Sequence, residues 1–208
     1  MRSPAGLDLV ARRPRVARVG PAPDATVVED AASGFLAALG VVVRAEGMRE
    51  TPGRMARAYA EMLDVPEFDL TTFPNEEAYD ELVLVENIPV QSLCEHHMLP
   101  FVGVAHVGYL PGQRILGLSK FARLVDFHSR AVQTQERLTK RIADHLQGQL
   151  APLGVGVVIE AEHTCMSLRG ARVAGARTVT SALLGQLRDD PASRAEFLAL
   201  ARPGRAAR

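Results

Sequence analysis

Apolar residues recur every three or four positions near the start of the chain and again after position 50, the spacing of amphipathic helices. In residues 27–40 the apolar positions at this spacing are Val28, Ala31, Ala32, Phe35, Leu36 and Leu39. A second helix is predicted to begin at Thr51-Pro52, with Thr51 as N-cap and proline at the first helical position. Its buried face is expected to hold Met55, Tyr59 and either Met62 or Leu63.

The pattern changes from residue 81 onward, where β-branched and apolar residues predict strands. The first three strands are expected at 81–90, 102–110 and 114–118. The turn Pro111-Gly112-Gln113 predicts that the second and third of them form a hairpin. A further pair of strands is predicted at 155–168 and 177–187.

Two helices are predicted between these groups of strands. Ser119 is expected to cap the first, which has Phe121, Leu124, Val125 and His128 on one face. The second has Leu138, Ile142, Leu146 and Leu150 at every fourth position. Helices followed by strands with two central helices predict an α+β fold with a mainly antiparallel sheet.

Composition narrows the class of protein. The chain has 208 residues, 47% of them hydrophobic, and balances 24 basic against 24 acidic side chains. It is therefore expected to form one globular domain, preceded by a flexible tail over 1–25. Its neutral charge and 5% aromatic content argue against nucleic-acid binding. No apolar run is long enough to span a bilayer, and no signal peptide is evident, so a cytoplasmic protein is expected.

Candidate chemistry centres on two segments about 70 positions apart, each with a cysteine within two residues of a histidine. Cys94 and His97 have the C-x-x-H spacing of metal ligands, and Cys165 is expected to share a strand face with His163. Cys94, His97 and Cys165 together would give three ligands, the number in a catalytic zinc site that keeps one position open. His96 and His163 then remain as general acids or bases. The alternatives are a structural zinc with His163 as fourth ligand, or buried cysteines and histidines without a metal.

A possible phosphate site lies at the start of the helix after Gly117. Lys120 and Arg123 in its first turn oppose the helix dipole, unless an anion binds there together with Ser119. Lysine is rare in this chain, with two lysines against 22 arginines. The other candidate cations are Arg54, Arg57 and Arg169. Taken singly, each is more simply explained as a solvated surface arginine, but together they predict a polyphosphate site.

Six motifs, in order, resemble the GTP cyclohydrolase I family. They are ETPGRMARAY (50–59), SLCEHHMLPFVGVAHVGYLP (92–111), GLSKFARLV (117–125), QTQERLTKRIA (133–143), EHTCMSLRG (162–170) and TVTS (178–181). The resemblance implies a zinc-dependent hydrolase of folate and pterin biosynthesis that converts GTP to 7,8-dihydroneopterin triphosphate and releases formate. It also implies a tunnelling fold, which has a four-stranded antiparallel sheet with helices on one side. In this chain that fold would occupy 81–202, after an N-terminal helical region at 26–80, and would assemble into a decamer with active sites between subunits.

The resemblance also implies roles for individual residues. Zn²⁺ would be bound by Cys94, His97 and Cys165. His96 matches the acid/base histidine beside the metal, and His163 and Ser119 match residues that assist opening of the ribose. Gln135 and Glu136 match the pair that lines the guanine pocket. The triphosphate contacts would be Ser119, Lys120, Arg123 and Arg169, with Arg54 and Arg57 at further basic positions.

Three residues depart from the family's usual pattern. Ala131 stands where an arginine is common, Ala176 where a serine is common and Val179 where a threonine is common. None removes a predicted ligand or acid. They leave open a paralogue that acts on another purine nucleotide in a specialised deazapurine or pterin pathway. A non-catalytic tunnelling-fold assembly module with structural zinc is the alternative outside the enzymes.

Overall fold

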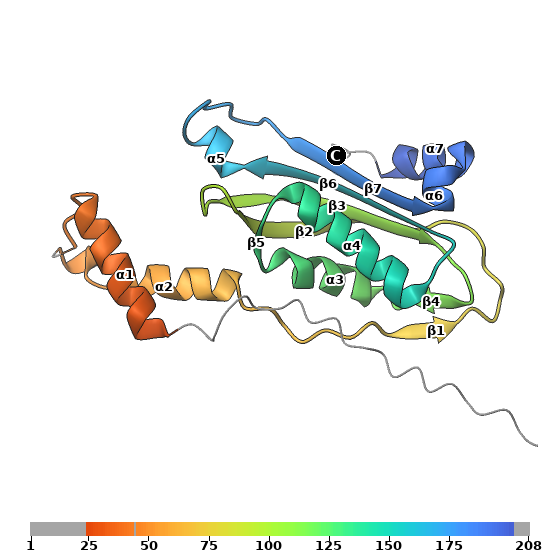
Figure 1. Ribbon diagram of the computed structural model, residues 1–208, viewed down its shortest axis with the longest axis horizontal. Coiled ribbons are helices and arrows are strands. Elements are labelled where there is room, and N and C mark those ends of the chain that lie inside the picture. The colour runs from red at the N-terminus through yellow and green to blue at the C-terminus, as the bar shows by residue number, and fades with distance from the viewer. Residues whose placement is uncertain (1–23, 44, 202–208) are drawn as a thin grey trace, which may run out of the picture.

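The computed structural model describes residues 24–43 and 45–201. A curved sheet forms the centre of this part of the chain, with helices packed against it and an N-terminal helical pair to one side (Figure 1). The predicted α+β class is confirmed. The expected tail at 1–25 lies almost wholly outside the described residues, and α1 begins at Ala25 with Asp24 as its N-cap.

The main sheet has five strands in the order β5-β2-β3-β6-β7. They are β2 (Val83–Cys94), β3 (Pro100–Leu110), β5 (Val132–Gln133), β6 (Gly154–His163) and β7 (Thr178–Gly185). The four long strands are antiparallel neighbours, as expected. The short β5 was not predicted; it pairs in parallel with the last two residues of β2.

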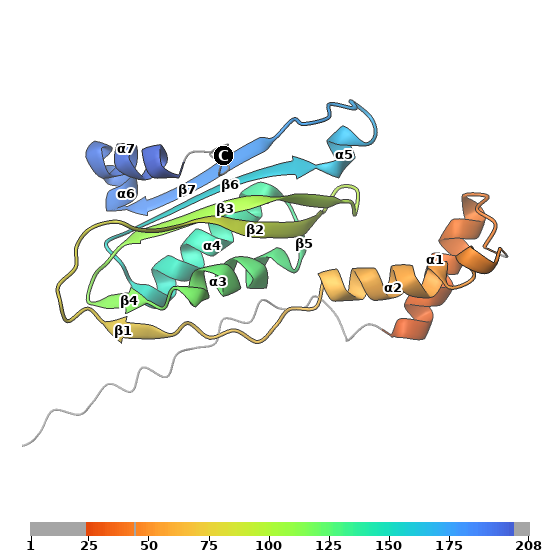
Figure 2. The same cartoon turned by 180° about the vertical axis from the view of Figure 1, so that it is seen from behind.

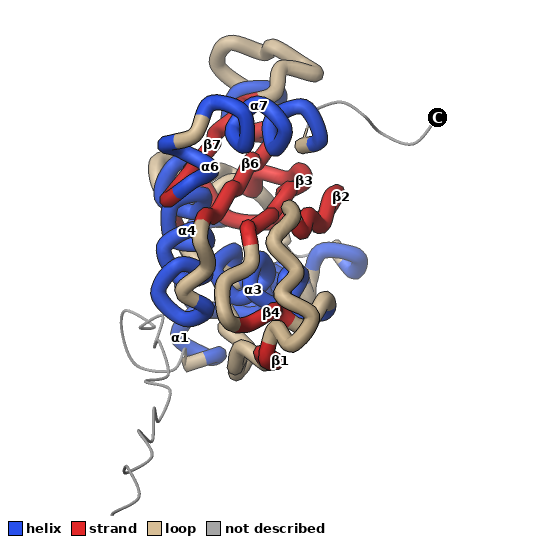
Figure 3. The backbone as a smooth tube through the Cα atoms, turned by 90° about the vertical axis from the view of Figure 1, so that its right-hand side faces the viewer, coloured by secondary structure: helices blue, strands red, loops and turns tan. Residues whose placement is uncertain are grey.

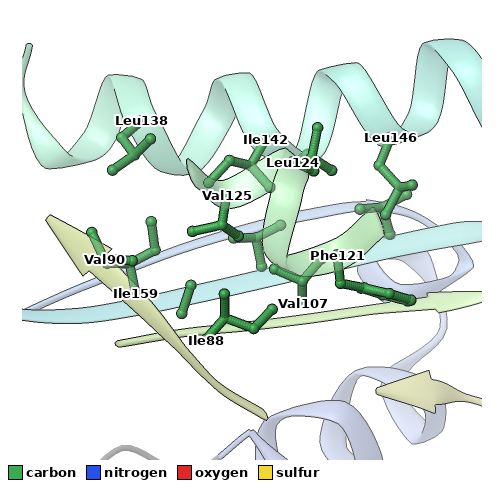
Figure 4. Close-up of a cluster of buried hydrophobic side chains, with 14 of the residues drawn as sticks. Ile88, Val90, Val107, Phe121, Leu124, Val125, Leu138, Ile142, Leu146 and Ile159 are labelled. Atoms are coloured by element: carbon green, nitrogen blue, oxygen red, sulfur yellow. The ribbon is translucent and has the colours of Figure 1, made fainter. Parts of the chain in front are cut away.

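Two helices, α3 (Ser119–Ser129) and α4 (Gln135–Leu150), cover one face of this sheet and lie together against the strands (Figure 3). The predicted apolar faces of both helices are buried there. Figure 4 shows Leu138, Ile142 and Leu146 of α4 above the strand side chains. Burial of such side chains contributes about 1.5–3 kcal/mol each, so this layer fixes α4 on the sheet.

The start of α3 differs by one residue from the prediction. Ser119 is the first helical residue, Leu118 occupies the N-cap position, and no side chain caps the helix. Gly117 and Leu118 instead accept backbone hydrogen bonds from Lys120 and Phe121.

The opposite face of the sheet also carries helices, which corrects the expectation of helices on one side only. After β7 the chain forms α6 (Gln186–Asp189) and α7 (Pro191–Leu200). Phe197 of α7 is fully buried against this face. A Cβ at Gly156 would lie 2.6 Å from the Phe197 ring, so glycine in β6 is what allows this helix to pack.

The N-terminal helices are α1 (Ala25–Ala38) and α2 (Thr51–Met62), with the short 3-10 helix η1 (Glu46–Met48) between them. They extend beyond one end of the sheet (Figure 2). Both were predicted, but only Leu36 on the predicted apolar face of α1 is buried, and Ala31, Phe35 and Leu39 on it are exposed. Thr51, the predicted N-cap, is the first residue of α2, and Glu50 occupies the N-cap position. The buried face of α2 consists of Pro52, Gly53 and Ala56, one step around the helix from the predicted one.

The predicted hairpin between 102–110 and 114–118 is wrong. The strand β4 (Arg114–Leu116) pairs with β1 (Thr72–Pro74) in a separate two-stranded sheet. The N–H of Leu116 is satisfied by the hydroxyl of Tyr109 at 2.8 Å instead of a ladder bond to β3. The turn at Pro111 therefore leads the chain away from the sheet toward α3.

Within the described residues, no helix combines the length and apolar character that a membrane span requires.

Candidate metal centre and active site

A tight turn at the end of β2 places the first two candidate ligands. The carbonyl of Cys94 accepts hydrogen bonds from the N–H groups of His97 and Met98. The N–H of Cys94 donates to the Leu99 carbonyl. Met98 has a φ of 55°, the left-handed conformation that closes such a turn. The C-x-x-H segment is thus a defined turn between β2 and β3, which brings the Cys94 thiol and the His97 ring to one side.

The third candidate, Cys165, does not lie in a strand, which corrects the prediction for 155–168. The strand β6 ends at His163, and the chain then forms the short helix α5 (Thr164–Ser167). The hydroxyl of Thr164 donates to the Pro100 carbonyl at 2.6 Å, which ties this change of direction to the start of β3. Strand alternation therefore does not explain the position of Cys165; the helical turn does.

The ligand atoms of Cys94, His97 and Cys165 lie within 4.8 Å of one another, so these residues could hold a metal ion. Cys94 is buried, Cys165 is half-buried and His97 is exposed. Burial raises the pKa of the Cys165 thiol, and the neighbouring Cys94 raises it further, so the two sulfurs resist ionising together. A bound cation would reverse this preference, because it stabilises thiolates directly. The donor set and its electrostatics therefore fit a metal centre.

Contacts from other elements hold the turn that carries these ligands. The Glu95 N–H donates to the Gln133 carbonyl at 3.3 Å, and the Glu95 carboxylate accepts from Arg137 in the first turn of α4. The hydroxyl of Tyr59 in α2 donates to the Met98 carbonyl at 3.2 Å. Our sequence reasoning missed these supporting residues, although Glu95 and Arg137 lie inside two of the motifs.

His96 lies beside the candidate metal site without belonging to the group of three. Its ring is exposed, and its Nδ1 lies 3.8 Å from the Cys94 sulfur. The centroids of the His96 and His97 rings are 6.3 Å apart, with one ring edge toward the other. His96 is therefore an exposed ring next to the candidate ligand Cys94.

His163 lies at the end of β6, two residues before Cys165. Its ring stacks on Phe101 with centroids 4.6 Å apart and an interplanar angle of 11°. Its Nε2 lies 2.9 Å from Oε1 of Gln135. Burial lowers the pKa of His163, and the negative charge of Glu136 opposes that shift in part.

The side chains of both glutamines in the Q-T-Q-E segment are buried. Gln133 is fully buried and donates to Ser92 and to the His128 carbonyl. Gln135 is also buried and donates across to β6 and β7. The intervening Thr134 caps α4 by accepting from the Arg137 N–H.

Glu136 has a different environment from its neighbour. Its side chain faces a groove of about 420 Å³ between α4 and the edge strand β7, together with Thr139, Lys140 and residues 180–184. Of the predicted guanine-binding pair, Glu136 has the open position, while the amide of Gln135 is occupied within the chain.

Within a single chain, the start of α3 lies far from the group formed by Cys94, His97 and Cys165, which is called the metal group below. The α3 residues concerned are Ser119, Lys120 and Arg123. They begin α3, where Phe121 packs against Tyr109 with ring centroids 5.8 Å apart. Tyr109 pairs with Val83, the first residue of β2, whereas Cys94 is its last. With about 3.3 Å of rise per residue, the two ends of β2 are roughly 35 Å apart. Figure 1 likewise shows β4 and α5 at opposite ends of the sheet.

The predicted arginines fall into two groups. Arg169 follows α5, and its positive charge partly offsets the upward shift in the pKa of the Cys165 thiol, so it lies near that cysteine. Arg54 and Arg57 are exposed on α2. Arg54 donates to the Gly47 carbonyl and to Thr51, contacts that stabilise the start of its own helix.

The three departures from the family pattern lie outside the metal group. Ala131 precedes β5, and its carbonyl accepts from Ser92. Ala176 lies in the loop before β7, and Val179 is an exposed residue of β7 itself.

Comparison with known proteins gives one consistent result. The family described as GTP cyclohydrolase I matches residues 28–202. A protein called GTP cyclohydrolase 1 from Streptomyces avermitilis is 54% identical over 178 residues, which cover 83% of this chain and 88% of the relative. One of the same name from Thermoanaerobacter pseudethanolicus is 50% identical over 181 residues, covering 85% and 96%. A third, from Mycobacteroides abscessus, is 52% identical over 182 residues, covering 85% and 89%.

Proposed function

Because this chain belongs to the GTP cyclohydrolase I family, we propose that it opens the imidazole ring of GTP with water, releases C8 as formate and yields 7,8-dihydroneopterin triphosphate. Family membership supports the reaction. The observation that carries the proposal at the level of residues is the convergence of Cys94, His97 and Cys165 from two distant segments.

The proposed ion at this site is Zn²⁺. Two thiolates and one imidazole are ligands that zinc favours, and a three-residue set leaves a coordination position for a non-protein ligand. When bound, zinc supplies Lewis acidity that makes water a nucleophile near neutral pH. The fit of the donor set supports zinc over magnesium or calcium, which prefer oxygen ligands.

Two histidines of the chain are proposed to move protons. His96 is exposed next to the Cys94 sulfur, from where it can protonate N7 of the guanine as water adds to C8. His163, stacked on Phe101, is proposed to assist opening of the ribose with Ser119 of another subunit. Their different burial supports this division of roles, because the exposed ring can follow the substrate while the stacked ring stays fixed.

Recognition of guanine is proposed to rest on Glu136. Its carboxylate can accept hydrogen bonds from the N1–H and 2-amino groups of guanine, donors that adenine lacks. Its open position in the groove beside β7 supports this role. Arg169 is proposed to contact the triphosphate from the same chain, because it already lies near Cys165.

The remaining phosphate contacts are proposed to come from a second copy of the chain. A single chain separates Ser119, Lys120 and Arg123 from Cys94 by roughly the length of β2, about 35 Å. Bound together, the two groups would fix GTP by its triphosphate and orient C8 at the metal. Arg54 and Arg57 are proposed as further phosphate contacts, and their exposure on α2 supports this role.

A tunnelling-fold decamer would provide this arrangement. Within the described residues, the outer edge of β7 has no strand neighbour, and β5 covers only the last two residues of β2. Free edges at both sides of an antiparallel sheet allow copies to join edge to edge into a ring. The exposed Phe35 and Leu39 on the apolar face of α1 support a further contact between rings. We also propose a cytoplasmic location, because both cysteines are free thiols suited to a reducing compartment.

The test is incubation of the protein with GTP while formate and pterin fluorescence are followed. Parallel incubations with ATP and ITP measure the nucleotide preference. Formate from GTP above that from ATP supports the proposal, whereas formate mainly from another purine triphosphate would favour the paralogue alternative. Metal binding without formate from any of them would favour the non-catalytic module.

A further inference from the structure

The side-chain amide of Gln135 has a fixed orientation. Its Nε2 lies 3.0 Å from the Ile159 carbonyl and 2.9 Å from the Thr178 carbonyl. Carbonyl oxygens only accept hydrogen bonds, so the group facing them must be the NH₂ and not the oxygen. The same NH₂ lies 3.0 Å from the hydroxyl of Thr180. Gln135 is 1% exposed, and rotating this amide would place its oxygen against two carbonyl oxygens, neither of which can donate.

This orientation decides what the other end of the amide can do. Oε1 of Gln135 lies 2.9 Å from Nε2 of His163, and an amide oxygen can only accept. His163 must therefore donate from Nε2. Within the described residues its Nδ1 has no hydrogen-bond partner, and the stacked Phe101 ring restricts rotation of the imidazole.

We infer that Gln135 is a positioning residue that holds His163 in the Nε2–H form and leaves Nδ1 as a hydrogen-bond acceptor for the substrate. The inference rests on the proposed function for what His163 does, but not for its tautomer. It also changes the role expected for Gln135, because an amide whose NH₂ and oxygen both have partners in the chain is not free to bind guanine. In general, the hydrogen bond at one histidine nitrogen selects which form the other presents.

Kinetics of variants separate positioning from substrate contact. If Gln135 acts through His163, Gln135→Met should lower kcat at least tenfold and change KM for GTP less than threefold. A guanine contact would instead raise KM. In a double-mutant cycle, Gln135→Met should add little to the loss already caused by His163→Ala. Multiplying losses in the double variant would overturn the inference.

A matched control addresses folding. Ser129→Ala removes a buried hydroxyl that donates to the Val125 backbone carbonyl in α3, and it leaves the Gln135–His163 contact in place. Both variants should lose stability, and only Gln135→Met should lose most of its kcat. Equal losses of kcat in the two variants would show a merely structural role.

Neutron diffraction from wild-type crystals grown in D₂O tests the tautomer without relying on activity or on a variant that folds. Deuterium on Nε2 of His163 is the expected result, and Nε2 without deuterium would overturn the inference. If wild-type protein released no formate from GTP, the proposed function would fail while this measurement still reported the tautomer.

Discussion

Arg137, in the first turn of α4, donates to the carboxylate of Glu95, the residue that directly follows the metal-site thiol Cys94. The contact joins the C-x-x-H turn to a helix that is held on the sheet by a row of buried side chains. The turn that carries the candidate ligands Cys94 and His97 is therefore held in part by α4.

Arg137→Gln should consequently weaken metal binding. Loss of groups that orient metal ligands typically costs about 10–100-fold in affinity, and this half-exposed pair is expected at the low end, about tenfold. Competition with a chromophoric zinc chelator measures the change. Lys140→Gln is the control, because it removes an exposed ion pair with Asp144 on the same helix. Equal affinities in the two variants would show that the Glu95 contact does not support the site.

His96→Ala should separate metal binding from turnover. His96 is outside the group of three ligand residues, so the variant is expected to keep its metal while formate release falls by about 10²–10⁴-fold. His97→Ala, which removes a proposed ligand, should lose the metal as well. Metal analysis and a formate assay on both proteins check this, and full turnover by His96→Ala would assign the proton transfer to another group.

Active sites built from two chains should be restored by mixing. Cys165→Ser removes a proposed metal ligand and Lys120→Ala removes a proposed phosphate contact, so each variant alone should be inactive. The two residues lie at opposite ends of the sheet. Co-expressed with different tags and purified as mixed oligomers, they should regain formate release at sites with one intact half from each chain. Co-expressed Cys94→Ser and Cys165→Ser, which damage the same end, should not recover. Mixed oligomers of the first pair without activity would contradict the two-chain site.

A buried histidine pair predicts acid sensitivity. Nε2 of His128 lies 2.8 Å from Nδ1 of His145 between α3 and α4. Burial, with smaller contributions from His145 and Arg141, lowers the pKa of His128 to about 3. The unfolded chain binds this proton below about pH 6.5, so the contribution to stability is complete above that pH and is lost as pH falls toward 3.

Unfolding by denaturant at pH 7.5 and 5 tests this expectation. The wild-type free energy of unfolding should decrease by up to about 1.4 kcal/mol per pH unit from His128 alone. His128→Gln should be less stable at pH 7.5 but show a shallower decline with acid. Any contribution from metal release is shared by the two proteins and cancels in the comparison, and identical slopes would refute the assignment to His128.

Sequence reasoning succeeded where local periodicity decides the structure. The buried faces of α3 and α4 follow from three-and-four spacing, and the four long strands follow from their β-branched runs. It failed where contacts between distant residues decide. Tyr109 supplies a hydroxyl to Leu116, and β1 supplies the strand partner, so the expected hairpin at Pro111 does not form.

The candidate site shows the same division. The metal group could be predicted because both cysteines have histidines nearby, although Cys165 reaches it from a helix and not from a strand. The role of Gln135 could not, because its partners are backbone carbonyls of β6 and β7 that any sequence would provide. The distance between Lys120 and Cys94 could not be predicted either, because the order of motifs along the chain does not determine which end of a sheet each motif occupies.

Metal content and GTP turnover, measured together on wild-type protein and on Cys165→Ser, test the central claim most directly. The wild type is expected to bind zinc at the three-residue site and to release formate with the appearance of pterin fluorescence, and Cys165→Ser is expected to lose both. Full formate release by wild-type protein stripped of metal would contradict the account.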